Sequence, residues 1–188
     1  MSEYKCLKLQ HYELNEFSLV PIRFEDRFLI MKWRNEQMYH LRQNRLLTSE
    51  DQNNYFLNIV GKEFDQEAPK QILFSFLKNG KCIGYGGLVH INYIDKNAEL
   101  SFIMATELEK DEFDINWSSF LKIIEPVAFN ELKLHKTSTY AFDLRPHLYK
   151  ILEKNKFLKE AILKEHAFYR NNFINVVIHS KINLHGRY

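Results

Sequence analysis

Four polar side chains stand at alternate positions in the segment "YAFDLRPHLY" (140–149), and together they could bind an anion and move a proton. They are Asp143, Arg145, His147 and Tyr149. An arginine holds a phosphate through paired N–H donors, and a histidine or tyrosine can donate a proton to a leaving group. The same residues also suit an ordinary turn before a helix that starts with Pro146. We expect at least one of the four to function in binding or catalysis.

A second unusual segment, "SFIMATELEKDEFDINWSSF" (101–120), begins like a buried strand and ends like the start of a helix. Turns of this kind hold phosphates in many α/β proteins, on free helix N–H groups and a glycine-rich loop. This turn has no glycine, and its charged residues are Glu107, Glu109, Lys110, Asp111, Glu112 and Asp114, a local charge of −4. Either the acids favour the positive end of a helix that Asp114 or Asn116 caps, or they repel an anion. Each unit-charge repulsion across about 8 Å of water is only about 0.5 kcal/mol, so we favour the first interpretation.

The hydrophobic pattern around these segments predicts the elements that position them. Strands are expected at 16–22, 71–77, 81–91, 98–105, 136–142, 157–169 and 173–182, and helices at 24–38, 48–60, 117–132 and 146–155. Asn79-Gly80 predicts a hairpin, Thr48 or Ser49 a helix cap, and Pro126 a kink in the long helix. The connection through that helix predicts parallel pairing of strands 98–105 and 136–142. Residues 143–149 then follow the carboxyl end of a strand, where α/β sheets bind ligands.

The expected fold class is α/β (mixed α+β), with a mixed six- to seven-stranded sheet and helices on both faces. A chain of 188 residues with 45% hydrophobic residues can bury one core, so residues 1–188 are expected to form a single domain. Cys6 and Cys82 lie too far apart in sequence to indicate a disulfide framework or a zinc site. The net charge of +2, without a dense basic face, does not indicate a nucleic-acid partner. No apolar run suits a signal peptide or a membrane span, so we expect a cytoplasmic protein.

The order of elements and several motifs resemble the GNAT superfamily of acyl-CoA-dependent N-acetyltransferases. "WRN" (33–35) with "LLTSEDQNNYF" (46–56) looks like the branch that acetylates amino groups of nucleotide sugars or of ribosomal-protein N-termini. "NAELSF" (97–102), "VAFNELKLHK" (127–136) and "KEHAFYRNNFINVVIHSKI" (164–182) resemble further family motifs. The resemblance covers roughly residues 16–182.

This resemblance implies transfer of an acetyl group from acetyl-CoA, a co-substrate, to a primary amine by direct attack in a ternary complex. It implies that Glu99 deprotonates the amine and that Tyr149 protonates the departing thiolate. A backbone N–H among Phe102, Ile103 and Met104 would stabilise the oxyanion, where the pantetheine arm pairs with the strand edge. This requires the sheet to separate beside residues 101–104.

The resemblance also suggests which residues bind the coenzyme's diphosphate and the acceptor. Ser118, Arg145 and His147 are expected to bind the coenzyme's diphosphate. The acceptor cleft is expected to include Arg34, Asn35, Gln52 and Tyr55, whereas Trp33 is assigned to the core.

Several departures from the family pattern keep alternatives open. Both glycines of the family's diphosphate loop are missing, Leu152 stands where the family often has its tyrosine, and Lys156 stands at the usual glycine. Tyr149 reaches the thiolate only if its helix is rotated or shifted. The acceptor is expected to be a small amine such as a nucleotide-linked amino sugar, with a protein N-terminus as the nearest enzyme alternative. A binding module that kept the fold without catalysis is the alternative from another class, and a homodimer is left open.

Overall fold

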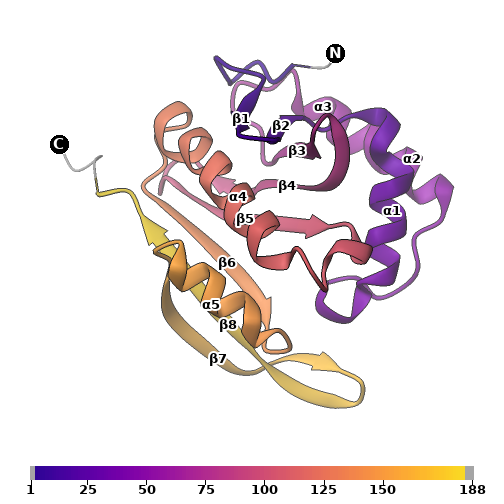
Figure 1. Ribbon diagram of the computed structural model, residues 1–188, viewed down its shortest axis with the longest axis vertical. Helices are drawn as coiled ribbons and strands as arrows, with labels where there is room; N and C mark the ends of the chain where they lie inside the picture. The colour runs from indigo at the N-terminus through magenta and orange to yellow at the C-terminus, as the bar shows by residue number, and fades with distance from the viewer. Residues whose placement is uncertain (1–2, 185–188) are drawn as a thin grey trace.

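An eight-stranded mixed sheet with helices on both faces is the framework of the computed structural model, which describes residues 3–184 (Figure 1). The strands are β1 (Tyr12–Leu14), β2 (Phe17–Pro21), β3 (Ile72–Lys78), β4 (Lys81–Asn92), β5 (Asn97–Met104), β6 (Lys136–Phe142), β7 (Leu158–Tyr169) and β8 (Asn172–Ile182). The helices are α1 (Arg27–Glu36), α2 (Ser49–Tyr55), α3 (Gly61–Glu63), α4 (Phe113–Pro126) and α5 (Pro146–Lys154). The predicted fold class is confirmed, and the eighth strand is the short β1, which the sequence analysis did not predict.

Local sequence signals explain several of these elements. Asn79 and Gly80 have φ values of 49° and 78°, as a two-residue hairpin between β3 and β4 requires. Thr48, one of the two predicted caps, caps α2 and forms a reciprocal capping box with Asp51. Pro146 occupies the first turn of α5. These three signals act within a few residues, which is why they could be read from the sequence.

The strands lie in the order β1-β2-β3-β4-β5-β6-β8-β7. β3, β4 and β5 form the predicted antiparallel meander, and α4 carries the chain from β5 to β6, which pairs parallel to β5. β6 then pairs antiparallel with β8 over seven residue pairs, from Lys136 to Phe142. The carboxyl ends of β5 and β6 therefore lie at the same end of the sheet.

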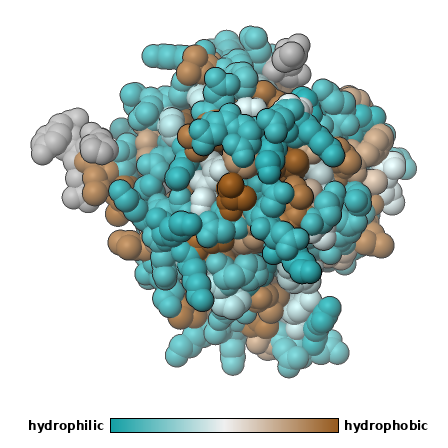
Figure 2. Space-filling model, in the orientation of Figure 1, coloured by the Kyte–Doolittle hydropathy of each residue, from teal (hydrophilic) through white to brown (hydrophobic). Residues whose placement is uncertain are grey.

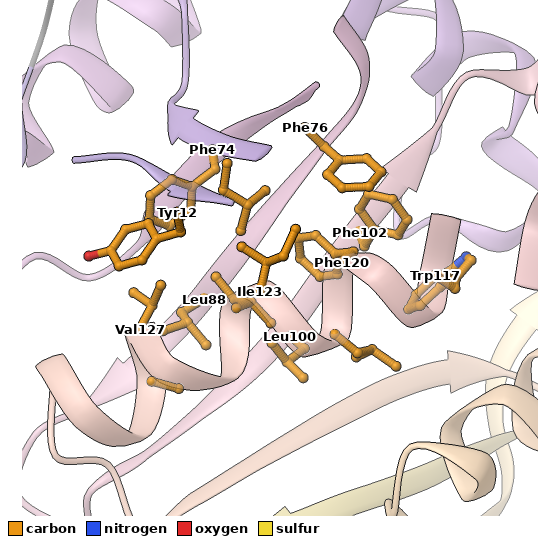
Figure 3. Packing of buried hydrophobic residues seen from close by; sticks show 14 of the residues in the cluster. Tyr12, Phe74, Phe76, Leu88, Leu100, Phe102, Trp117, Phe120, Ile123 and Val127 are labelled. Atoms are coloured by element: carbon orange, nitrogen blue, oxygen red, sulfur yellow. The ribbon is translucent and has the colours of Figure 1, made fainter. Parts of the chain in front are cut away.

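Two hydrophobic clusters cover the two faces of the sheet. On the α4 face, the Phe102 ring stacks on Phe120 with centroids 4.1 Å apart, and it meets Trp117 edge-on at 4.9 Å (Figure 3). On the other face, Ile30 and Trp33 of α1 pack with Ile103, so Trp33 is a core residue as predicted. Figure 2 shows that hydrophilic residues cover most of the face in view, with hydrophobic residues scattered among them.

The beginning and end of α4 differ from the prediction. The helix begins at Phe113 rather than residue 117, and neither Asp114 nor Asn116 caps it, because the N-cap position is Glu112 and makes no capping hydrogen bond. Asp114 lies instead in the first turn, where a carboxylate favours the positive end of the helix. Pro126 ends the α-helical part, and a π-helical turn, Val127–Glu131, follows.

None of the helices within residues 3–184 combines the length and apolar character that crossing a membrane requires.

Candidate functional site

β5 and β6 separate soon after they begin, and we call this point the fork. Their parallel pairing joins Asn97, Ala98 and Glu99 to Lys136, Thr137 and Ser138. Beyond these pairs β6 follows β8 away from β5, as Figure 1 shows. Beyond Glu99, β5 pairs with no strand other than β4, so its other edge has free backbone groups at residues 100–103 that need partners. The separation beside residues 101–104, on which the predicted site depends, is present.

A cavity of about 90 Å³ lies in the fork. Its lining comes from both strands, from the segment after α1, and from α4 and α5: His40–Arg42, Glu99–Ile103, Trp117, Thr139–Phe142, Arg145 and Leu148. An exposed strand edge beside such a cavity can accept an extended chain that pairs with the backbone. We call it the fork cavity.

Glu99 lies at the base of the fork, with its side chain 16% exposed. The carboxylate accepts a hydrogen bond from Arg42 and contacts His90 Nδ1 at 3.0 Å. The Arg42 guanidinium also lies 4.6 Å from the ring centroid of Tyr140 on β6, so it bridges the two separating strands. His90 has a φ of 51° at a β-bulge in β4, which turns its imidazole towards Glu99. The sequence analysis identified Glu99 but not these two partners.

The predicted acceptor residues of α1 form a hydrogen-bonded network under the segment after α1. Arg34 donates to the Tyr85 hydroxyl at 2.7 Å and to Gln43 at 3.1 Å. Asn35 donates to the Leu47 carbonyl and accepts from the Leu47 N–H. These contacts fix residues 38–47 and thereby Arg42. Arg34 and Asn35 do not line the fork cavity.

The two predicted acceptor residues of α2 form hydrogen bonds inside the protein. Gln52 is buried and donates to the Arg27 carbonyl at 2.9 Å, so it ties α2 to α1. The Tyr55 hydroxyl donates to Gln71 at 3.1 Å, and burial raises the pKa of Tyr55. Neither residue lines the fork cavity, and their contact with an acceptor stays a prediction.

Four of the five acids of the glycine-free turn pair with cations from elsewhere in the fold. The pairs are Glu107 with Lys32 (4.0 Å), Glu109 with Arg145 (3.4 Å), Glu112 with Lys78 (2.8 Å) and Asp114 with Lys154 (3.0 Å). Gln37 adds hydrogen bonds to the Met104 carbonyl and to Thr106 at 2.8 and 3.0 Å. The carboxylates therefore anchor the turn to α1, β3 and α5, which neither interpretation of the sequence anticipated.

Arg145 is the cation of this group that lies inside the fork cavity. Its side chain is 10% exposed, and its guanidinium lies 5.7 Å from the Phe113 ring centroid. Burial raises the pKa of Glu109, and the charge of Arg145 partly offsets this effect. Burial also lowers the pKa of His40 to about 3, with Arg145 acting in the same direction, so His40 is a neutral imidazole in the cavity wall. An anion that binds Arg145 would therefore compete with the Glu109 carboxylate for the guanidinium.

The remaining predicted residues lie near Arg145 but outside the cavity lining. His147 packs edge-on against Phe113, with ring centroids 4.5 Å apart, and burial lowers its pKa. The Ser118 hydroxyl donates to Asp114 and accepts from Asn155. The Tyr149 hydroxyl donates to Asp143 at 2.9 Å, and burial together with Asp143 raises the pKa of Tyr149. Protonation of the thiolate by Tyr149 stays a prediction that requires this side chain to leave Asp143.

A wider cavity of about 910 Å³ adjoins the fork cavity and shares Leu41, Arg42 and Phe142 with it. It lies between the segment after α1 and the tip of the β7–β8 hairpin. Aromatic side chains and arginines dominate its lining: Tyr39, Phe142, Phe168, Tyr169, Arg42 and Arg170. Glu36 is its one carboxylate within the described residues. We call it the hairpin cavity.

Comparison with known proteins places this geometry in a family. Residues 19–178 match the model of the acetyltransferase (GNAT) domain. The fold is similar to that of spermidine N-acetyltransferase from Vibrio cholerae in complex with CoA and spermine, with a TM-score of 0.76, 19% identity, and coverage of 90% of this chain and 96% of that one. A mutant of that enzyme has a TM-score of 0.74 and 20% identity, over 93% of this chain and 98% of the other. A search of curated proteins finds no match.

Proposed function

The chain belongs to the GNAT acetyltransferase family, and we propose that it transfers the acetyl group of acetyl-CoA to a primary amine in a ternary complex. The observation that carries this proposal is the fork, where a strand edge lacks its partner beside an enclosed cavity. Bound acetyl-CoA would supply the acetyl group as an activated thioester.

The residues of the fork fit such a co-substrate. The open edge of β5 at Phe102 and Ile103 can pair with an extended arm and can offer an N–H to an oxyanion. Arg145, with His147 beside it, would hold the phosphates, which replaces the glycine-rich loop that this chain lacks. Ser118 lies inside α4, beyond the free N–H groups of the first turn, so it could bind the phosphates only if its hydroxyl left Asp114 or Asn155.

Glu99 is the proposed general base. An acceptor arrives as an ammonium ion, and its nitrogen must lose a proton before it can attack a carbonyl carbon. Arg42, whose side chain is 48% exposed, now occupies the cationic position beside this carboxylate. The ammonium would replace Arg42 there and pass one proton to a carboxylate oxygen of Glu99, which leaves the nitrogen lone pair free.

The coenzyme's diphosphate and Glu109 would compete for Arg145, and two substitutions test this competition. Arg145→Gln removes the phosphate ligand, so the Kd for CoA should rise about tenfold, the value of one charged hydrogen bond. Glu109→Gln breaks the same ion pair but releases Arg145, so the Kd should fall. Calorimetric titration with CoA measures both. A change in the same direction for the two variants would mean that the ion pair matters only for folding.

The acceptor is proposed to be a nucleotide-linked amino sugar. Four aromatic side chains in the hairpin cavity can stack on a base and a sugar, and Arg42 and Arg170 can bind phosphates. A polyamine would bring several positive charges to a cavity that already holds two arginines and one carboxylate. This charge pattern favours an acceptor that carries negative charge.

Initial rates with a panel of nucleotide-linked amino sugars and with spermidine test this assignment. We expect the best nucleotide-linked acceptor to exceed spermidine in kcat/KM by about tenfold or more, because like charges brought together in a cleft cost several kcal/mol. Arg170→Gln removes one of the proposed phosphate ligands and should reduce this difference in kcat/KM between the nucleotide-linked acceptor and spermidine. A preference for spermidine in the unmodified protein would exclude the proposed acceptor class while leaving acetyl transfer intact.

A further inference from the structure

A second large cavity, of about 1020 Å³, lies at the other end of β5 and β6 from the fork. Figure 1 shows this end of the sheet, where both strands begin and β8 ends. Its charged lining comes from five separate segments: Lys96, Lys122, Glu125, Lys133, Lys156 and Lys181. His135 also lines it. We call it the basic cavity. Its five lysines and one glutamate give it more net positive charge than the whole chain, which carries only +2.

Most of this charge is uncompensated. Glu125 is ion-paired with Lys181, which also donates to the Asn155 carbonyl at 3.3 Å. Within residues 3–184, the other four lysines form no ion pair; they are Lys96, Lys122, Lys133 and Lys156. Like charges gathered around one concave surface raise its potential and attract anions.

The backbone conformation at three of these lysines is a second indication of a ligand site. Lys96, Lys133 and Lys156 have φ values of 52°, 53° and 67°, in the left-handed region that glycine and asparagine tolerate best. A longer side chain there costs on the order of 1 kcal/mol relative to glycine. They sit in three different connections, β4–β5, α4–β6 and α5–β7, and all three face the same cavity. Residues held in sparsely populated backbone regions often mark a ligand site.

Apart from Asn130 and Asn183, the rest of the lining is apolar, and this limits the class of ligand further. Pro126, Phe129, Leu134, Ile182 and Leu184 line the cavity beside the lysines. Phe129 and Leu134 are buried and provide a rigid wall. Lysine ammonium groups bind phosphates as point charges. We infer that the basic cavity binds a small molecule that carries two or more phosphate groups, at a site separate from the fork.

Pyrophosphate is the probe that tests this inference, in calorimetric titration at low ionic strength. The decisive variant replaces Lys96, Lys133 and Lys156 together by glycine, which removes three charges while suiting the left-handed backbone, so the fold should be kept. We expect affinity for pyrophosphate to fall by about tenfold or more, because a charged hydrogen bond is worth about that factor. The Tm of the variant should be equal to or higher than the Tm of the unmodified protein.

Two controls separate this site from other cationic surfaces. Replacing Lys62, Lys70 and Lys81 by glutamine removes the same charge elsewhere and should leave the affinity unchanged. In Arg145→Gln, which removes the proposed phosphate ligand of the fork, pyrophosphate should still bind in the basic cavity, and adding the three glycine substitutions should then weaken that binding. The inference would be overturned by equal affinity of the triple-glycine variant and the unmodified protein, or by complete loss of pyrophosphate binding in Arg145→Gln. Binding of single-stranded oligonucleotides without binding of pyrophosphate would also overturn it.

Discussion

Glu99→Gln is expected to lower kcat by about 10²- to 10³-fold, the usual contribution of a general base that is in place. The amide keeps the size and the hydrogen bond from Arg42 but cannot take a proton from the ammonium. Because the side chains of Arg42 and His90 are both substantially exposed, weaker contacts of these residues with position 99 should cost little stability, on the order of 1 kcal/mol or less.

Glu160→Gln is the matched control. Glu160 is also a strand carboxylate paired with a cation, Lys136 at 2.6 Å, but it lies on β7 and lines neither the fork cavity nor the hairpin cavity. Its substitution should leave kcat unchanged. If Glu99→Gln instead kept the rate and the pH profile of the unmodified protein, another group or an ordered water would be the base.

Phe120→Ala is expected to destabilise the fold by about 3–5 kcal/mol, the usual cost of a large-to-small change in a tightly packed core. Phe120 is fully buried and packs on Phe102 and Phe76 from the α4 face (Figure 3). For a chain of this length the loss corresponds to a fall in Tm of roughly 6–20 °C, measurable by calorimetry. Phe102 lies on the open edge of β5. Because Phe120→Ala removes the ring on which Phe102 stacks, this substitution should also loosen the fork.

Phe173→Ala provides the comparison, because its side chain is 65% exposed on the β7–β8 hairpin. We expect a change in the free energy of unfolding within about 1 kcal/mol. A Phe120→Ala protein as stable as Phe173→Ala would mean that α4 does not hold β5 in the way described.

Most of the fold could be predicted because its signals are local or periodic. Asn79-Gly80 specifies a hairpin by its own backbone preference, and the alternation in residues 98–105 separates Glu99 and Ser101 from Leu100 and Phe102. β1 was missed because three residues, Tyr12–Leu14, are too few for a periodic pattern. The caps proposed for α4 were wrong because the helix begins one turn earlier, at Phe113.

The candidate site was harder to predict because its geometry depends on residues distant in the sequence. Arg42 reaches Glu99 across 57 positions, and Arg145 reaches Glu109 across 36. The acids of the turn therefore looked unbalanced in the sequence, although the fold supplies cations for four of the five. The basic cavity could not be predicted for the same reason, because its lysines come from five segments that are far apart in the sequence.

The claim on which the function rests is that the fork is the acetyl-CoA slot. A crystal structure of the protein grown with CoA tests it most directly. We predict an extended arm between the separated parts of β5 and β6, hydrogen-bonded to the backbone of residues 100–103. Well-ordered coenzyme bound elsewhere, with β6 paired directly to that edge of β5, would contradict the account.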